Sequence, residues 1–213
     1  MINDFISVYD NSFTSDECEE YINLIEHYII NGVITKEDRA YHNTDHFSLN
    51  FNNDVSYNIL SGDNLSLEFL PKIKDYVDDY LKKFSVLGQE KLLIYDTKAK
   101  KIPIGGGFHN WHYENTGLQV SARKLVIQLY LNTIEEGGET EFLPHMVSIK
   151  PTKGSLVIFP AGWTHKHRGK MPISNKKYIL NFWVYSKNPA IEEYIDELKT
   201  IDIKGKDYKF NWI

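Results

Sequence analysis

The 213-residue sequence predicts a mainly β domain with flanking helices, and three observations support this fold class. From Lys91 to Tyr185 the chain carries short runs of β-branched and aromatic residues, separated by Gly and Pro. Short strands at such intervals are typical of a sandwich or barrel. Upstream, two stretches show apolar residues at helical spacing. No repeat or low-complexity linker divides the chain, so we expect the helices to buttress the β region within one domain.

Three helices are expected around the β region. Thr14-Ser15-Asp16-Glu17 offers capping side chains before a helix from Cys18 to Ile30, and Gly32 supplies a stop. A second helix is predicted from about Ser66 to Phe84, and a third from about Ala190 to Thr200, before a polar tail. Apolar residues recur on one face of the first two: Tyr21, Leu24, Ile25 and Tyr28, then Leu67, Leu70, Ile73, Val77 and Leu81.

The strands are predicted from the positions of the short apolar runs, and one strand carries polar residues on a single face. In Lys124–Leu131, the residues Leu125, Ile127, Leu129 and Leu131 share one face, and Lys124, Val126, Gln128 and Tyr130 share the other. A strand interior with Gln and Tyr on one side suits a wet pocket better than a dry core. The predicted strands are Lys91–Tyr95, Leu118–Val120, Lys124–Leu131, Val147–Ile149, Ser155–Phe159 and Tyr178–Tyr185.

The segment from Thr35 to Gly62 is polar and rich in Asn, with interspersed aromatic residues. We interpret it as irregular or partly extended. Its length, its polarity and its few core residues are properties of a binding loop, so we expect it to border the functional site and to contact the primary substrate as a lid.

Composition restricts the classes of function. The formal net charge of −5 is mild and no basic face is concentrated in the sequence, so nucleic acid is not an expected partner. A single cysteine, Cys18, excludes an intramolecular disulfide framework and is compatible with a reducing compartment. No apolar run reaches the length of a membrane span, and Met1-Ile2-Asn3-Asp4 does not resemble the start of a signal peptide. These features predict a cytoplasmic enzyme without membrane contact, and they leave its oligomeric state open.

Two histidine-bearing motifs predict a metal site. His112-Tyr113-Glu114 and, about fifty residues later, the segment from Trp163 to Arg168 can together supply two imidazoles and one carboxylate. This is the ligand set of the facial triad in non-haem Fe(II) oxygenases, which leaves other coordination positions open. On a strand His112 and Glu114 share a face, whereas His109 points the other way and is a poor ligand. His165 and His167 share a face as well, so strand alternation does not decide between them.

Further motifs follow in a fixed order along the chain. The order is Gly105-Gly106-Gly107-Phe108-His109-Asn110-Trp111-His112-Tyr113-Glu114, Tyr130-Leu131-Asn132, Gly137-Gly138-Glu139-Thr140-Glu141-Phe142, Lys150-Pro151 to Gly154 with Leu156-Val157-Ile158-Phe159-Pro160, and His167 to Lys177-Tyr178. The series resembles the prolyl-4-hydroxylase-like branch of the 2-oxoglutarate- and Fe(II)-dependent oxygenases, from about Leu92 to Tyr185. Single pieces such as Gly-Gly-Glu-Thr are unspecific, but their order and spacing are not.

The resemblance implies roles for individual residues. His112, Glu114 and His167 would be the metal ligands, since that family carries a basic residue about ten positions after the distal His, and this spacing selects Lys177 and His167. Lys177 would hold the far carboxylate of 2-oxoglutarate. Tyr130 would hydrogen-bond the same carboxylate, and Trp183 would form a pocket wall. Together these six residues make the predicted catalytic, metal and cofactor-binding site.

Two departures from the family pattern stand out. The family more often has Asp where this chain has Glu114, so the carboxylate lies one methylene farther from the backbone. Many members also carry a Tyr near Lys101-Ile102-Pro103-Ile104 that touches the co-substrate, and this chain has no Tyr between Tyr95 and Tyr113.

The fold implied by the resemblance is a double-stranded β-helix, that is, a jelly roll or cupin-like barrel. We expect a single domain over residues 1–213, with a helical buttress over about 1–90, a β-helix core over about 91–186, and a helix and tail over about 187–213. The implied activity is that of an Fe(II)- and 2-oxoglutarate-dependent dioxygenase that hydroxylates an unactivated C–H bond with O2 and releases succinate and CO2, with ascorbate as a reductant. Peptidyl proline is the first substrate candidate; another peptide or protein side chain and a small molecule are its rivals.

Two other functions compete with this interpretation. One is a metal-binding jelly-roll protein without oxygenase activity, for which Lys177 would have no purpose. The other is a cupin-like iron enzyme that does not use 2-oxoglutarate and adds a third His, for which His165 is the obvious spare.

Overall fold

The structure is a computed structural model that describes residues 4–31, 35–39, 54–59, 64–87 and 90–187. These residues form two antiparallel sheets. The larger sheet has the order β1 (Ser7–Tyr9), β8 (Leu156–Pro160), β5 (Arg123–Tyr130), β10 (Lys177–Ser186), β4 (Leu92–Ile102), β3 (Asp54–Ile59) and β2 (Thr35–Arg39). The smaller sheet has the order β7 (Val147–Ile149), β6 (Thr140–Phe142) and β9 (His167–Gly169).

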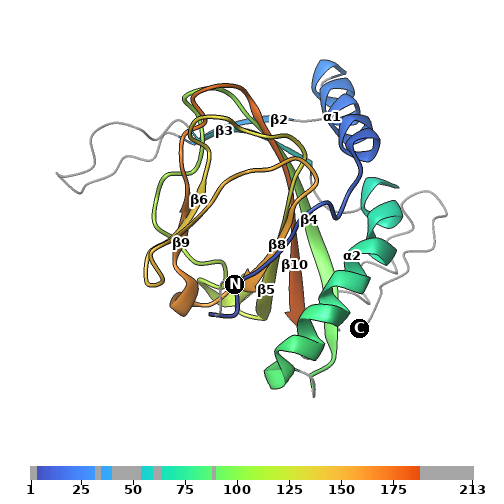
Figure 1. Ribbon diagram of the computed structural model, residues 1–213, viewed down its shortest axis with the longest axis vertical. Helices are drawn as coiled ribbons and strands as arrows, with labels where there is room; N and C mark the ends of the chain where they lie inside the picture. The colour runs from blue at the N-terminus through green and yellow to red at the C-terminus, as the bar shows by residue number, and fades with distance from the viewer. Residues whose placement is uncertain (1–3, 32–34, 40–53, 60–63, 88–89, 188–213) are drawn as a thin grey trace.

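The two sheets and two helices are arranged in three layers. Helices α1 (Ser15–Ile30) and α2 (Asn64–Lys83) lie on one side of the large sheet, and β6 and β9 lie on its other side (Figure 1). This arrangement of two facing antiparallel sheets confirms the predicted mainly β fold with flanking helices, of the jelly-roll type. Three short 3-10 helices, η1 (Ser85–Leu87), η2 (Leu118–Val120) and η3 (Trp163–His165), complete the described elements.

Helix α1 forms where its cap and its apolar face predict it. The Thr14 side chain accepts a hydrogen bond from the backbone N–H of Glu17, and the Glu17 carboxylate accepts one from the backbone N–H of Thr14. This reciprocal capping box satisfies two backbone donors that the first helical turn leaves unpaired. Tyr21 and Ile25 are buried against the sheet, as their spacing predicts. The predicted stop, Gly32, lies outside the described residues.

Two apolar clusters lie on the two faces of the large sheet. One lies under the helices and contains Ile73 and Val77 of α2 together with alternate residues of β5, namely Leu125, Ile127, Leu129 and Leu131 at its end. The other lies between the sheets and contains Val126, Tyr130, Phe142, Phe159 and Trp183. The predicted alternation of β5 is therefore confirmed. Its polar face, with Gln128, points into the space between the sheets, where the candidate site lies.

Several sequence-based boundaries were wrong. Leu118–Val120 is a 3-10 helix and not a strand, because Leu118 is 93% exposed and the Ser121 side chain closes the turn by donating to the Leu118 carbonyl. The strand predicted over Lys91–Tyr95 continues to Ile102, since it pairs with β10 along its length. His112-Tyr113-Glu114 is not a strand either; only His112 makes an isolated bridge.

The segment from Thr35 to Gly62 contains two strands that the sequence did not predict as such. β2 and β3 form an antiparallel pair at the edge of the large sheet, where β3 pairs with β4. Residues 40–53 and 60–62 lie outside the described residues, so the lid role stays a prediction. The helix expected over Ala190–Thr200 also lies outside them.

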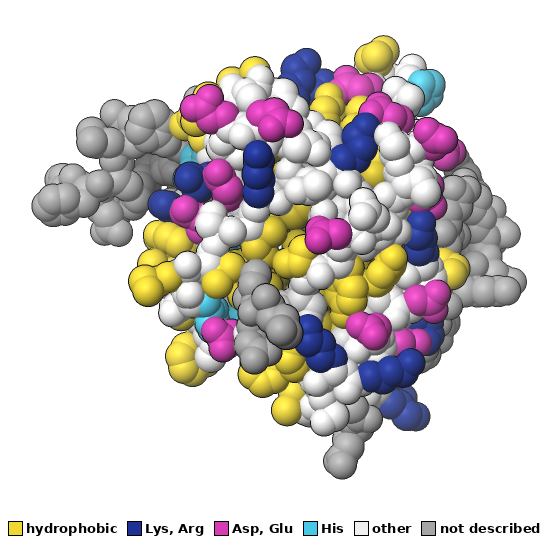
Figure 2. Space-filling view, in the orientation of Figure 1, with side chains coloured by type: hydrophobic (Ala, Val, Ile, Leu, Met, Phe, Trp, Pro, Cys, Tyr) yellow, Lys and Arg dark blue, Asp and Glu magenta, His cyan; other side chains and the backbone are white. Residues whose placement is uncertain are grey.

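The surface carries mixed charge. On the face shown in Figure 2, basic and acidic side chains are interspersed. Within the described part of the chain, no helix combines the length and the apolar character needed to cross a bilayer.

Candidate metal centre

A reciprocal pair of backbone hydrogen bonds joins the two motifs of the predicted site. The N–H of His112 donates to the carbonyl of His167 over 2.9 Å, and the N–H of His167 donates to the carbonyl of His112 over 2.8 Å. Side chains of directly opposed residues in an antiparallel pair lie on the same face. The two imidazole rings therefore lie side by side, with centroids 4.4 Å apart.

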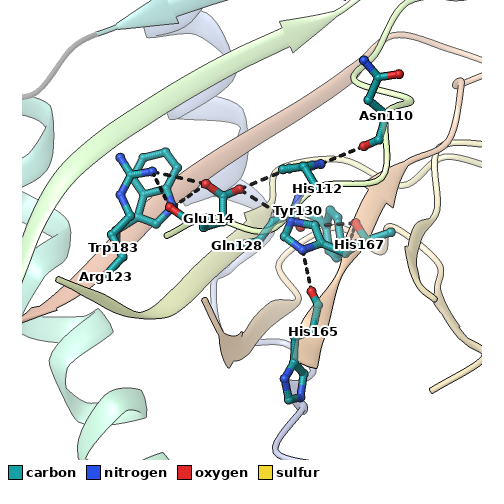
Figure 3. A network of polar contacts seen from close by, with 10 residues as sticks. Asn110, His112, Glu114, Arg123, Gln128, Tyr130, His165, His167 and Trp183 are labelled. Atoms are coloured by element: carbon teal, nitrogen blue, oxygen red, sulfur yellow. Dashed lines mark hydrogen bonds and ion pairs between the residues drawn. The ribbon is translucent and has the colours of Figure 1, made fainter. Parts of the chain in front are cut away.

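The backbone also fixes the tautomer of both rings. Nδ1 of His112 lies 2.9 Å from the carbonyl oxygen of Asn110, and Nδ1 of His167 lies 2.9 Å from that of His165 (Figure 3). A carbonyl oxygen can only accept, so each Nδ1 carries a proton, and each Nε2 is the ring nitrogen that is turned toward Glu114 and that a metal would take. Such partners on the far ring nitrogen are a common feature of metal-binding histidines.

Glu114 reaches the same point from the turn after His112. Its backbone N–H donates to the carbonyl of Ala161, which holds the turn against the end of β8. Its Oε1 lies 3.3 Å from Nε2 of His112 and 3.5 Å from Nε2 of His167. Among the described residues, His112, Glu114 and His167 are the group whose ligand atoms all lie within 4.8 Å of one another.

This donor set fits a divalent metal ion. Ligands about 2.1 Å from a metal and at right angles to each other lie about 3 Å apart. The distances from Oε1 to the two Nε2 atoms exceed that value by only a few tenths of an ångström. Two imidazoles and one carboxylate on one side of the ion leave its other positions open, as in the facial triad of non-haem Fe(II) enzymes.

The protonation states also suit a metal. Burial alone would raise the pKa of Glu114, but hydrogen bonding and charge interactions with His112 and His167 outweigh it and hold this pKa well below its usual value. Burial lowers the pKa of His167. Glu114 is therefore anionic and His167 neutral near pH 7, and these are the forms that bind metals.

His112, Glu114 and His167 line a cavity between the two sheets. Its walls combine apolar side chains with polar ones from β4, β5, β6 and β10. The lining residues are Lys100, Ile102, Phe108, His112, Glu114, Val126, Gln128, Thr140, Phe159, His167, Gly169, Lys177, Ile179 and Asn181.

Lys177 brings a cation to this cavity. Its side chain is 2% exposed, and its Nζ donates to the carbonyl of Gly138 over 2.6 Å. Desolvation, reinforced by the charge of Lys100 and opposed by that of Glu139, lowers the pKa of Lys177 to about 7. A buried amine that is half charged near neutral pH would be fully charged by an anionic ligand beside it. The exposed neighbour Lys176 has no such position.

The turn before β6 places the carbonyl that Lys177 binds. Gly137 has φ +76°, and a Cβ there would lie 2.2 Å from the carbonyl oxygen of Met171. Only glycine fits this close approach in the left-handed region. The tight turn then carries Gly138 toward Lys177 and starts β6 with Thr140, which lines the cavity. The motif Gly-Gly-Glu-Thr thus forms the turn that places the Gly138 carbonyl beside Lys177 and Thr140 at the cavity wall.

Tyr130 and Trp183 are not among the residues that line the cavity, although both lie next to residues that do. The hydroxyl of Tyr130 donates to Oγ1 of Thr140 over 2.8 Å, and Nζ of Lys177 lies 5.2 Å from its ring centroid. Nε1 of Trp183 donates to Oε2 of Glu114 over 3.1 Å. Direct contact of these two aromatics with a co-substrate stays a prediction, because their observed contacts are with Thr140, Lys177 and Glu114.

The spare histidines lie elsewhere. His165 belongs to η3, so it does not alternate with His167 along one strand as expected, and its Nε2 lies 2.7 Å from the carbonyl oxygen of Asp4. His109 makes a hydrogen bond through Nδ1 with the carbonyl of Gly169. Neither His165 nor His109 belongs to the group formed by His112, Glu114 and His167.

Sequence reasoning missed some of the cavity's polar residues. Asn181 is 7% exposed, and its Oδ1 has no hydrogen-bond partner among the described residues. It follows Lys177 by four positions on β10, so strand alternation could have found it. Lys100 faces the cavity from β4, where its backbone pairs with Ile179. Arg123, which contacts Glu114, stands in no motif.

The candidate site lies within a segment that matches a known protein family. Residues 98–185, which include all three converging ligands and Lys177, match the family described as the 2OG-Fe(II) oxygenase superfamily. The matched segment covers 88 of the 213 residues. The protein is a 2-oxoglutarate-dependent dioxygenase, and its cofactors are Fe(II), 2-oxoglutarate and O2. No curated protein matches the chain.

Solved structures share its fold. A viral collagen prolyl hydroxylase from Paramecium Bursaria Chlorella virus-1, in a 2OG complex, is 22% identical with a TM-score of 0.64 over 87% of this chain and 98% of that one. A Pseudomonas putida prolyl-4-hydroxylase is 16% identical with a TM-score of 0.64, over 87% and 95%. A Trichoplax adhaerens prolyl hydroxylase, in complex with a peptide fragment of the hypoxia inducible factor oxygen degradation domain, is 19% identical with a TM-score of 0.65, over 86% and 84%.

Proposed function

We propose that this dioxygenase binds Fe(II) through His112, Glu114 and His167, binds 2-oxoglutarate through Lys177, and hydroxylates an unactivated C–H bond of a peptide substrate with release of succinate and CO2. The observation that carries the proposal is the convergence of the three ligand atoms at a cavity that also contains the buried Lys177. A buried, positively charged amine beside a metal that only stabilises the fold would weaken metal binding by charge repulsion. Lys177 is therefore easier to explain as a partner for an anionic co-substrate than as part of a structural metal site.

The bound Fe(II) and 2-oxoglutarate supply the oxidant that inserts one oxygen atom of O2 into the target bond. The protein's own residues position and protect this chemistry. Asn110 and His165 fix the two imidazoles through their carbonyls, and the Nζ of Lys177 attracts the far carboxylate of the co-substrate. Phe108 packs edge-on to the His112 ring, with centroids 4.4 Å apart, and Phe159 packs on the His167 ring at 4.8 Å. These ring contacts restrict the rotation of both imidazoles.

Next to Lys177, a chain of side-chain hydrogen bonds joins Tyr130, Thr140 and Gln128. Tyr130 donates to Thr140, and Oγ1 of Thr140 donates to Oε1 of Gln128 over 3.2 Å. Burial raises the pKa of Tyr130, so its hydroxyl stays protonated and remains a donor. The unpartnered Oδ1 of Asn181 adds a polar atom to the wall of the cavity. A cavity with these groups suits a short molecule that is charged at both ends better than an apolar one.

A peptidyl substrate, with proline as the first candidate side chain, is proposed by likeness to the prolyl hydroxylases above, one of which holds a peptide fragment. The alternative of a cupin-like enzyme with a third His finds no support in the described residues, because His165 is bound to Asp4 outside the metal cluster.

The test is to measure succinate from 2-oxoglutarate with Fe(II) and ascorbate, with and without proline-containing peptides. We expect Fe(II)-dependent succinate formation that increases with a peptide substrate, and a peptide that gains one oxygen atom by mass spectrometry. Peptides in which Ala replaces Pro serve as matched controls. Equal oxygen gain by both peptide sets would exclude proline as the target, and succinate formation unaffected by chelation of Fe(II) would contradict the metal assignment.

A further inference from the structure

The two carboxylate oxygens of Glu114 face different partners. Oε1 faces Nε2 of His112 and Nε2 of His167, at 3.3 and 3.5 Å. Oε2 points the other way, where Nε1 of Trp183 donates to it over 3.1 Å and Nη1 of Arg123 donates to it over 3.3 Å. Figure 3 shows Glu114 between the two imidazoles on one side and the Trp183 and Arg123 side chains on the other.

Arg123 is itself held in place by several contacts. Its Nε donates to the Tyr185 hydroxyl over 2.7 Å, and its Nη1 also donates to the backbone carbonyl of Glu114 over 3.3 Å. Its guanidinium carbon lies 4.2 Å from the Trp183 ring centroid. The Arg123 side chain is only 12% exposed, so water weakens its charge interaction with Glu114 less than it would at the surface. A planar, stacked and hydrogen-bonded guanidinium presents its donors in one fixed direction.

This arrangement restricts a torsion that Glu would otherwise leave free. The last torsion of a Glu side chain is broad, so an unsupported carboxylate rotates readily. A metal beside such a carboxylate can take one oxygen or both. With Oε2 engaged by an indole N–H and by a charged guanidinium, only Oε1 is directed toward the two imidazoles. Partners of this kind behind a ligand typically contribute ten- to a hundredfold to metal affinity.

We propose that Arg123 and Trp183 act as positioning residues that hold Glu114 as a monodentate ligand, through Oε1 alone. Three ligand atoms then leave three positions of an octahedral ion open, which is what a chelating 2-oxoacid and O2 together require. A bidentate Glu114 would take one of these positions. The inference rests on the proposed metal role of His112, Glu114 and His167, and adds to it how the carboxylate is oriented and by which residues.

The first experiment is a double-mutant cycle read out by anaerobic Co(II) titration, without turnover. Arg123→Met should weaken Co(II) affinity by about ten- to a hundredfold. Glu114→Asp withdraws the carboxylate by about 1.5 Å, away from Arg123 and Trp183. In that background the further loss on Arg123→Met should be under about threefold, because non-additivity marks residues that act through each other. Equal losses in both backgrounds would overturn the proposal.

A second readout is the coordination of Glu114 in crystals of Co(II)-loaded protein. Wild type should show one carboxylate oxygen about 2.0–2.2 Å from the metal. In Arg123→Met the second oxygen should move to the metal as well. Unchanged monodentate binding in Arg123→Met would contradict the inference, and this readout holds even where Glu114→Asp binds Co(II) too weakly for the cycle. Trp183→Phe, which removes the indole donor but keeps a ring, should weaken Co(II) binding several-fold and keeps the test possible if Arg123→Met does not fold.

The chain offers a matched control. The guanidinium of Arg168 also stacks on a Trp ring, that of Trp111 at 4.5 Å, and its Nε donates to Glu141 over 2.8 Å. Arg168→Met should leave Co(II) affinity unchanged, and a loss as large as that of Arg123→Met would point to a general effect of losing a stacked arginine. These variants test the metal site and the positioning role of Arg123 and Trp183 separately. If His112→Ala binds Co(II) as tightly as wild type, the metal site itself fails; if only Arg123→Met and Trp183→Phe are silent, the positioning role fails.

Discussion

Replacing Lys177 by Met removes the cavity's buried ammonium and keeps most of its volume. The structure gives the size of the expected effect. The Nζ of Lys177 is buried, so its bond to the co-substrate carboxylate would form in a site with little water. A hydrogen bond between charged groups contributes on the order of 1.5–3 kcal/mol. At 1.4 kcal/mol per decade, the dissociation constant for 2-oxoglutarate should rise by about ten- to a hundredfold.

The assay is calorimetric titration of 2-oxoglutarate into metal-loaded protein without oxygen, followed by the apparent Michaelis constant for succinate formation. Metal affinity should survive, because Lys177 is not one of the converging ligands. Lys177→Arg should lose less than Lys177→Met, since the charge is kept in a different geometry. The exposed Lys176 is the matched control, and Lys176→Ala should be nearly silent. A large effect at Lys176 with none at Lys177, or no effect at either, would refute the reasoning.

Three more predictions follow from the same groups. His112→Ala, Glu114→Ala and His167→Ala should each abolish metal-dependent turnover, while His165→Ala should keep much of it; iron loss on His165→Ala alone would reverse the assignment. Because the pKa of Lys177 is about 7, the Michaelis constant for 2-oxoglutarate should rise as pH increases above about 7, and a flat profile from pH 6 to 9 in wild type would contradict a charged anchor. Lys177→Met should also raise the melting temperature of the ligand-free protein. The folded-state pKa lies below the ordinary value of 10.5, so the gain should be full below about pH 7 and should shrink as pH rises toward 10.5.

Much of the fold could be predicted because its elements carry strong local signals. The capping box at Thr14 and Glu17 marks the start of α1, and the alternation of Leu125, Ile127 and Leu129 marks the two faces of β5. Strands of three residues, such as β6 and β9, carry no such signal, since their pairing with distant partners decides them. The same limit accounts for the wrong strand prediction over Leu118–Val120, which is a 3-10 helix.

The candidate site was predictable where residue type and order carry the chemistry. The two histidines, Glu114 and Lys177 are of this kind, and the structure brings all four to one cavity. The reason given for the convergence of His112 and Glu114 was wrong, because a backbone bridge and a turn place them, not a regular strand. Arg123 could not be found from sequence, since its role depends on how the chain after Glu114 folds back to bring its guanidinium beside the carboxylate.

The most direct test of the account is anaerobic binding of 2-oxoglutarate to the Fe(II)-loaded protein, in wild type, His167→Ala and His165→Ala. It needs no substrate and no turnover. We expect one 2-oxoglutarate to bind per chain in wild type and in His165→Ala, and we expect binding to be lost when Fe(II) is omitted and in His167→Ala. Failure of Fe(II)-loaded wild type to bind 2-oxoglutarate, or equal binding by His167→Ala, would contradict the central claim that His112, Glu114 and His167 hold the iron to which the co-substrate binds.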